Sequence, residues 1–102
     1  MGEIVKFVTV LLPEYNIEVC LPIKINLTVA EMVILELLLQ GKDVSEIATY
    51  RQKSPKTISS QKLQLYKKLG IKNDITFWRE VILRYNLMIG YLPKANITNN
   101  VF

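Results

Sequence analysis

Two segments of the chain carry the capping-box pattern, in which a short polar residue is followed three positions later by glutamate. The first is Thr28-Val29-Ala30-Glu31, and hydrophobic residues at helical spacing follow it as far as Gly41. The second is Asp43-Val44-Ser45-Glu46. The two patterns therefore predict a longer helix that stops at Gly41 and a short helix that runs to about Tyr50.

A third helix is predicted from Ser54 to Gly70. Ser54 can accept a hydrogen bond from a free backbone N–H, and Pro55 fits the first helical turn, where its missing N–H costs nothing. Gly70 suits a left-handed cap that ends the helix. The residues that can face a core at helical spacing are Ile58, Leu65 and Leu69. Three capped helices in succession predict a helix-turn-helix with a supporting helix in front.

The first 26 residues predict strands. Hydrophobic and polar residues alternate from Ile17 to Ile25, which is typical of a strand with one apolar face. Pro22 lies inside this run and favours an edge or bulged strand. Residues 4–12 are rich in β-branched side chains, and Pro13-Glu14-Tyr15-Asn16 can form a turn, so we expect a β-hairpin. A helix is the alternative for residues 4–12, because their hydrophobic residues also fit helical spacing.

The hairpin needs a partner, because a lone hairpin is only marginally stable. The helix that begins after Thr28 can supply one, since it is apolar nearly all round. In addition to the core candidates Ile34, Leu35 and Leu38, it carries Val29, Met32, Val33 and Leu39. We therefore expect the N-terminal segment to pack on this helix, within one protomer or across a dimer. The alternative is that the segment is a remnant of a larger regulator's receiver domain.

Basic residues are concentrated in the third predicted helix and its surroundings. Seven of them lie between Arg51 and Lys72, a stretch without Asp or Glu, and the net charge of the chain is +4. Lysines among serine, threonine and glutamine side chains are typical of a helix that lies on DNA. The alternative is an ordinary solvated face. The capped helices around the cluster favour DNA binding.

Five short motifs follow one another without a gap in their order. They are Leu27-Thr28-x-x-Glu31, Ile34-Leu35-x-Leu37-Leu38-x-x-Gly41, Glu46-Ile47-Ala48, Ser54-x-Lys56-Thr57-Ile58 and Lys68-Leu69-Gly70-Ile71. Together they resemble the DNA-binding domain of LuxR/NarL-type regulators over about residues 27–85. Residues 56–62, followed by Lys68-Leu69-Gly70 and Asn73-Asp74-Ile75, are similar to the enteric branch that contains the capsule regulator RcsB. That branch shares Gln61, where other members often carry histidine.

The resemblance implies a mainly α fold, a four-helix helix-turn-helix domain to which this chain adds a hairpin-like N-terminal extension. The third helix would enter the major groove of double-stranded DNA, and the chain would act as a sequence-specific transcriptional regulator. The residues expected to contact phosphates are Lys56, Thr57, Lys62, Lys67 and Lys72. Those expected to meet base edges are Ser59, Ser60 and Leu63. Lys62 and Lys67 could instead be merely solvated, and Leu63 could be a surface apolar residue or a contact with a partner.

The fourth helix of the family commonly supports dimerisation. Its candidate residues here are Trp78, Val81, Ile82 and Tyr85, in an apolar stripe that also holds Met88 and could simply be core. The expected partner is a second copy or another LuxR-type regulator. A second interpretation is an accessory module that pairs with a larger regulator and changes its targets.

The composition disfavours an enzyme. The chain has no His, no glycine-rich phosphate loop and no cluster with metal-ligand spacing, so we expect no catalytic residue, metal, cofactor or small-molecule ligand. The single cysteine, Cys20, suits a reducing cytoplasm, and no apolar run approaches the roughly 20 residues that span a membrane. We expect a cytoplasmic, nucleoid-associated protein with an extension over 1–26, a DNA-binding domain over 27–90 and a loosely held tail over 91–102.

Overall fold

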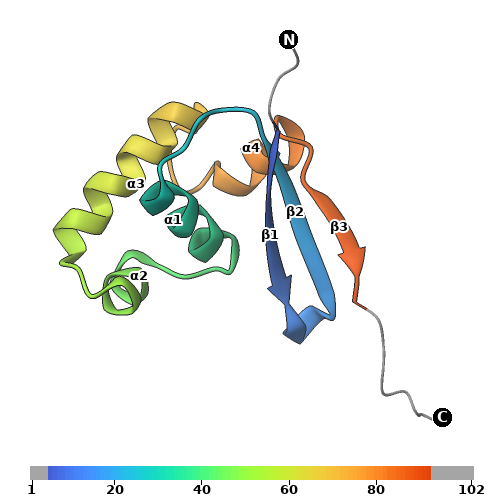
Figure 1. Ribbon diagram of the computed structural model, residues 1–102, viewed down its shortest axis with the longest axis horizontal. Helices are drawn as coiled ribbons and strands as arrows, with labels where there is room; N and C mark the ends of the chain where they lie inside the picture. The colour runs from blue at the N-terminus through green and yellow to red at the C-terminus, as the bar shows by residue number, and fades with distance from the viewer. Residues whose placement is uncertain (1–4, 93–102) are drawn as a thin grey trace.

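The computed structural model describes residues 5–92, which form four α-helices and a three-stranded antiparallel sheet (Figure 1). Along the chain the elements are β1 (Lys6–Leu12), a 3-10 turn (Pro13–Tyr15), β2 (Ile17–Ile23), α1 (Val29–Leu39), α2 (Val44–Arg51), α3 (Pro55–Leu69), α4 (Phe77–Leu83) and β3 (Met88–Tyr91). Helix α1 lies between α3 and β1 and contacts both (Figure 1). The expected fold is therefore right for the four helices and the hairpin, but the sheet is larger than expected.

Two of the predicted helix starts are confirmed by their capping hydrogen bonds. At α1 the Thr28 hydroxyl accepts from the Glu31 backbone N–H at 3.1 Å, and the Glu31 carboxylate accepts from the Thr28 N–H at 2.8 Å. Asp43 and Glu46 form the same reciprocal pair at α2, with both bonds at 2.9 Å. These bonds satisfy backbone groups that have no partner inside the helix. Polar caps thus fix where α1 and α2 begin.

The N-terminal residues form the predicted hairpin, so the alternative of a helix is wrong for the described residues 5–12. β1 and β2 pair in antiparallel register along their whole length. Asn16 closes the turn in the left-handed conformation, with φ of 56°, which asparagine tolerates better than most residues.

The sequence pattern does not predict the third strand. β3 pairs antiparallel with β2 and places Met88 opposite Cys20. Met88 is therefore not part of the last helix, as its apolar stripe suggested, because α4 ends at Leu83. Asn86 then adopts a left-handed conformation, with φ of 58°, which turns the chain out of the helical path. The sheet thus joins residues from both ends of the described chain.

Pro22 does not place β2 at an edge, because β2 is the central strand of the sheet. Pro22 faces Phe7 of β1, whereas β3 pairs only with the residues from Ile17 to Cys20. Pro22 thus lies beyond the end of β3, where a residue without an N–H breaks no bond to that strand. The proline is therefore compatible with a central position of β2.

One face of the sheet packs on the helices. The buried side chains of this face are Val8, Val10, Val19, Leu21 and Ile23. They form one core with buried residues of the helices, among them Ile34, Leu35, Ile47, Ile58 and Leu65. The prediction that the N-terminal segment packs on α1 is therefore confirmed.

The covered part of α1 is smaller than its apolar surface suggested. Leu39 is fully buried, and Met32 and Val33 are half-buried against the core. Val29, however, is 79% exposed, so its expected coverage by the hairpin is wrong. It lies in the first turn of α1.

Within residues 5–92 no helix is long and apolar enough to cross a membrane. The longest, α3, has 15 residues, whereas a membrane-spanning helix needs about 20. Over the same range, no group of three or more Cys, Asp or Glu side chains is placed to hold a metal ion.

Candidate nucleic-acid interface

Helix α3 has both of its predicted ends. At its start the Ser54 hydroxyl accepts from the Thr57 backbone N–H at 3.1 Å, and Pro55 occupies the first turn. At its end Gly70 is left-handed, with φ of 74°. A Cβ at Gly70 would lie 2.2 Å from the Nη1 atom of Arg84, so a larger residue would displace that side chain as well as strain the backbone.

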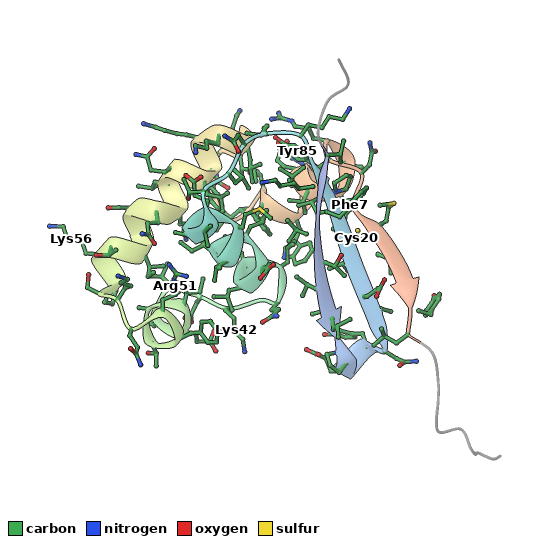
Figure 2. All side chains as sticks on the ribbon, viewed as in Figure 1. Phe7, Cys20, Lys42, Arg51, Lys56 and Tyr85 are labelled. Carbon is green, nitrogen blue, oxygen red and sulfur yellow. The ribbon has the colours of Figure 1, made fainter. Side chains whose placement is uncertain are left out.

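One side of α3 is turned away from the rest of the molecule. Ser60, Leu63 and Lys67 recur at the spacing of one helix face, and all three are exposed. Leu63 is 61% exposed, whereas Leu65, two positions later, is completely buried. Lys56 projects outward from the first turn (Figure 2). We call this set, Lys56, Ser60, Leu63, Gln64 and Lys67, the outward side of α3.

A shallow hollow of about 390 Å³ lies between the outward side and the loop that follows the helix. It is lined by Ser60, Leu63, Gln64, Tyr66, Lys67, Ile71 and Lys72. Lys72 therefore shares a surface with Lys67 although it lies after the helix. Lys56, Lys67 and Lys72 make no hydrogen bond or ion pair with any other residue of the described chain.

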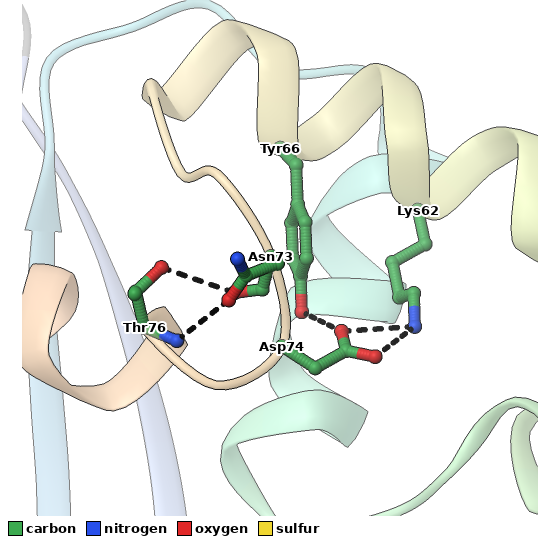
Figure 3. A network of polar contacts seen from close by, with 5 residues as sticks. All are labelled: Lys62, Tyr66, Asn73, Asp74 and Thr76. Carbon is green, nitrogen blue, oxygen red and sulfur yellow. Dashed lines mark hydrogen bonds and ion pairs between the residues drawn. The ribbon is translucent and has the colours of Figure 1, made fainter.

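Lys62 points to a different part of the molecule. Its Nζ atom donates to both carboxylate oxygens of Asp74, at 3.0 and 3.1 Å, and the Tyr66 hydroxyl donates to the same carboxylate at 2.6 Å (Figure 3). The ammonium group also lies 5.7 Å from the centre of the Tyr66 ring. Only 15% of the Lys62 side chain is exposed. The structure thus separates Lys62 from the other predicted phosphate contacts.

Lys68, the neighbour of Lys67, is also paired. Its Nζ atom donates to Glu31 Oε1 at 2.8 Å. Glu31 is buried, and the hydrogen bond from Lys68 lowers its pKa below the ordinary value of 4.5. One glutamate therefore caps α1 and binds α3 to it.

The polar groups around Asp74 shift one another's ionisation. The hydrogen bond from Tyr66, followed by that from Lys62, lowers the pKa of Asp74. Burial raises the pKa of Tyr66, and the Asp74 carboxylate raises it further. At neutral pH the acid is therefore charged and the phenol is neutral, which is the combination that the hydrogen bonds require.

Two predicted residues at the start of α3 have mixed surroundings. Thr57 is exposed, and its hydroxyl oxygen accepts from the Ser54 hydroxyl at 3.0 Å. Ser59 is half-buried.

Two buried polar atoms near α3 have no hydrogen-bond partner among the described residues. They are the Oε1 atom of Gln61 and the Nε atom of Arg51, and we have no physical account of either.

The two residues that follow helix α4, Arg84 and Tyr85, hold the end of α3. Arg84 Nη1 donates to the backbone carbonyls of Leu69 and Gly70 at 3.2 Å each, and the Tyr85 hydroxyl donates to the Leu69 carbonyl. The last carbonyls of a helix have no partner inside it, so these bonds satisfy them. Glu80 holds Arg84 in place through an ion pair, with 3.2 Å between Glu80 Oε1 and Arg84 Nε.

The four residues predicted for dimerisation are not equally available. Val81 is fully buried in the protein's own core, and Tyr85 is half-buried with its hydroxyl bonded as above. Trp78 and Ile82 are 37% and 46% exposed. Leu83, which the apolar stripe did not include, is 71% exposed.

Three contributors to this region are missing from the sequence-based predictions. Gln64 could have been identified, because it follows Ser60 by four residues and therefore lies on the same side of the helix. Asp74 and Arg84 act through contacts 12 and 15 residues away in the chain. Nothing in the local pattern indicates which lysine or carbonyl they would meet.

Comparison with known proteins now identifies the fold. The sequence profile described as "Bacterial regulatory proteins, luxR family" matches residues 25–80, which include all of α1, α2 and α3. The chain belongs to the LuxR family of bacterial regulatory proteins. Helices α2 and α3 are thus its helix-turn-helix, and transcription regulation through DNA binding is the function class of the domain.

Two curated proteins of Escherichia coli K12 are similar to this LuxR-family chain. The cyclic di-GMP phosphodiesterase PdeL is 48% identical over 77 residues, 76% of this chain and 21% of its own length. The uncharacterized HTH-type transcriptional regulator YuaB is 48% identical over 67 residues, 66% of this chain and 18% of its own length. The chain thus spans about a fifth of either relative. No solved structure matches it.

Proposed function

We propose that this LuxR-family chain is a sequence-specific transcriptional regulator that binds double-stranded DNA with the outward side of α3 in the major groove. The observation that carries the proposal is that three lysines without a partner among the described residues, Lys56, Lys67 and Lys72, are exposed on α3 and the loop after it, together with Ser60 and Leu63. The major groove is about 12 Å wide and admits one α-helix. The name of YuaB, a transcriptional regulator, supports the same class.

In this proposal the lysines hold the domain on the DNA backbone. Lys56, Lys67 and Lys72 contact phosphates, which look alike at every base pair and so position the helix without reading sequence. Thr57 adds a hydroxyl at the start of the helix, where the positive end of the helix dipole also favours a phosphate. Lys62 is left out, because Asp74 already holds it.

The side chains between the lysines read the bases. Ser60 can bond several base edges, and Leu63 can contact the methyl group of a thymine. Gln64, exposed on the same side, can make the paired hydrogen bonds by which an amide recognises adenine. Ser59 is half-buried and takes a smaller part.

We further propose that the protein acts as a dimer through α4. The exposed apolar side chains of this helix are Trp78, Ile82 and Leu83, whereas Val81 is buried in the core of the protomer. The partner is a second copy or another LuxR-type regulator. The exposed apolar surface of α4 also supports a second candidate function, that of an accessory module that alters the targets of a larger regulator.

The proposal does not extend to the chemistry of the larger relative. PdeL is named as a phosphodiesterase, but this chain matches only 21% of it, and the matched family is regulatory. A DNA-binding role places the protein in the bacterial cytoplasm with the nucleoid. The narrower likeness to the RcsB-containing branch rests on residues 56–62, 68–70 and 73–75 of the sequence.

The salt dependence of DNA affinity tests this function. If a dimer neutralises about four to six phosphates, the logarithm of the association constant should fall with the logarithm of the salt concentration at a slope near −4 to −5. Purified protein would be titrated onto a labelled duplex at several salt concentrations. A flat response, or binding only after a second regulator is added, would contradict the proposal, and the latter would favour the accessory module.

A further inference from the structure

Strand β1 is an unprotected edge of the sheet. Within residues 5–92 its one neighbour is β2, and the two strands pair in unbroken register over all seven residues of β1. Natural edge strands usually carry prolines, bulges or several charges that prevent pairing with another chain. β1 has no proline, no break in its register and a single charge, that of Lys6.

The outer face of the sheet is apolar where β1 crosses it. Phe7 and Leu11 point outward and are 58% and 53% exposed, whereas Val8 and Val10 between them are buried. Thr9 faces Cys20 across the β1–β2 ladder and lies two residues after Phe7, so it is on the same outer face. The exposed face of an antiparallel sheet is normally polar, so large apolar side chains here indicate a binding surface.

The sequence of β1 is nearly symmetric about Thr9. It reads Phe7-Val8-Thr9-Val10-Leu11, so an antiparallel copy aligned on Thr9 places Phe7 opposite Leu11. Val8 then faces Val10, and Thr9 faces its own counterpart. This register keeps outward residues beside outward residues and buried ones beside buried ones. Aromatic with aliphatic, and threonine with threonine, are favourable cross-strand pairs.

The charges at the two ends of β1 agree with the same arrangement. Lys6 begins the strand, and Glu14 lies in the turn just after it. In an antiparallel pair each Lys6 approaches the end of the other copy that carries Glu14. That end has a hollow of about 280 Å³ lined by Leu11, Leu12, Pro13, Glu14, Gln40 and Lys42, so one further lysine is also present there.

We propose that β1 pairs with β1 of a second copy of this chain about a twofold axis at Thr9. The two sheets then form one continuous sheet of six strands, an isologous interface in which the same patch serves both copies. This contact is separate from DNA binding and from the surface of α4. A strand pair buries little area, so we expect weak self-association.

Cysteine cross-linking tests the register. Thr9 lies opposite Cys20, with Oγ1 and Sγ 3.6 Å apart, so Cys20→Ala must be introduced first to prevent an internal disulfide. In that background Thr9→Cys should form disulfide-linked dimers, and a mixture of Phe7→Cys and Leu11→Cys chains should cross-link to each other. Tyr91→Cys, 86% exposed on the opposite edge strand, is the matched control for random collision. Equal cross-linking of Thr9→Cys and Tyr91→Cys would overturn the proposal.

A charge at the axis tests the contact without a covalent bond. Thr9→Lys places two like charges directly opposite each other and should weaken self-association by at least about tenfold. Thr49→Lys, at an exposed position of α2, makes the same change elsewhere. Every chain in this comparison also carries Ile82→Glu, at an exposed position of α4, to remove association through that helix. Sedimentation from about 1 µM to about 1 mM covers the range of weak interfaces. An Ile82→Glu chain that stays monomeric throughout, or a Thr9→Lys chain that associates like Thr49→Lys, would refute the pairing of β1.

Discussion

The two sides of α3 use the same residue type for different purposes. Lys67 is exposed and has no partner among the described residues, whereas Lys68, the next residue, donates to buried Glu31 at 2.8 Å. Lys62 is likewise held by Asp74. A count of basic residues therefore overstates the charge that α3 can offer to DNA. What decides the role of each lysine is the position of an acid far away in the sequence.

The two sides of α3 should differ most in how much a substitution there lowers stability. Two leucines of the helix form a matched pair for measuring this difference. Leu65 is completely buried and Leu63 is 61% exposed. Leu65→Ala should lower the free energy of unfolding by about 2 to 5 kcal/mol, because it leaves a cavity. Leu63→Ala should change it by less than about 0.5 kcal/mol. Urea denaturation of both variants measures the difference, and equal losses would remove the distinction between the sides.

The adjacent lysines Lys67 and Lys68 should differ in what their removal changes: DNA binding for Lys67 and stability for Lys68. Lys68→Ala leaves buried Glu31 without its ion-pair partner and should lower the free energy of unfolding by about 1 kcal/mol. This is the low end of the usual cost of a buried group that loses its partner, because the lysine itself is partly exposed. Its effect on DNA should be small. Lys67→Ala should leave stability unchanged and reduce the salt slope of DNA binding by about 1 per contact. Thermal unfolding and salt titrations test both, and a Lys68→Ala variant with the larger loss of salt slope would reverse our assignment.

The smallest effect concerns Asp74, which keeps Lys62 on the inner side. Asp74→Asn should cost about 0.5 to 1 kcal/mol, because the Asp74 side chain is 68% exposed and its ion pair is screened. The pKa of Asp74 is lowered from 3.8, so its contribution is present above that pH and disappears as pH falls through the lowered value. The stability gap between wild type and Asp74→Asn should therefore close below about pH 3.8. A gap that persists in acid would show that the carboxylate charge is not its source.

Local patterns predicted the helices because capping is local chemistry. Thr28 with Glu31, Asp43 with Glu46, and Ser54 each bond within three residues, so sequence spacing is sufficient to find them. The end of α3 at Gly70 is predicted for the same reason, since helices commonly end at a left-handed residue and glycine adopts that conformation most easily.

The features that escaped prediction depend on distant contacts. β3 is short, and its place in the sheet depends on the turn at Asn86 and on β2, which is far away in the sequence. Val29 belongs to an apolar run, but the hairpin reaches only part of α1. Lys62 is predicted as a phosphate contact from its charge, because nothing in the local pattern indicates that Asp74, 12 residues later, binds it.

The most direct test of the central claim compares anchoring with reading on the outward side of α3. Affinities for an operator duplex and for random DNA would be measured at one fixed salt concentration for Lys56→Ala and Ser60→Ala. Lys56→Ala should weaken both by similar factors, because it removes a phosphate contact. Ser60→Ala should cost about 1 to 3 kcal/mol on the operator and little on random DNA. If Ser60→Ala keeps its full operator preference, this side of α3 does not read bases as proposed.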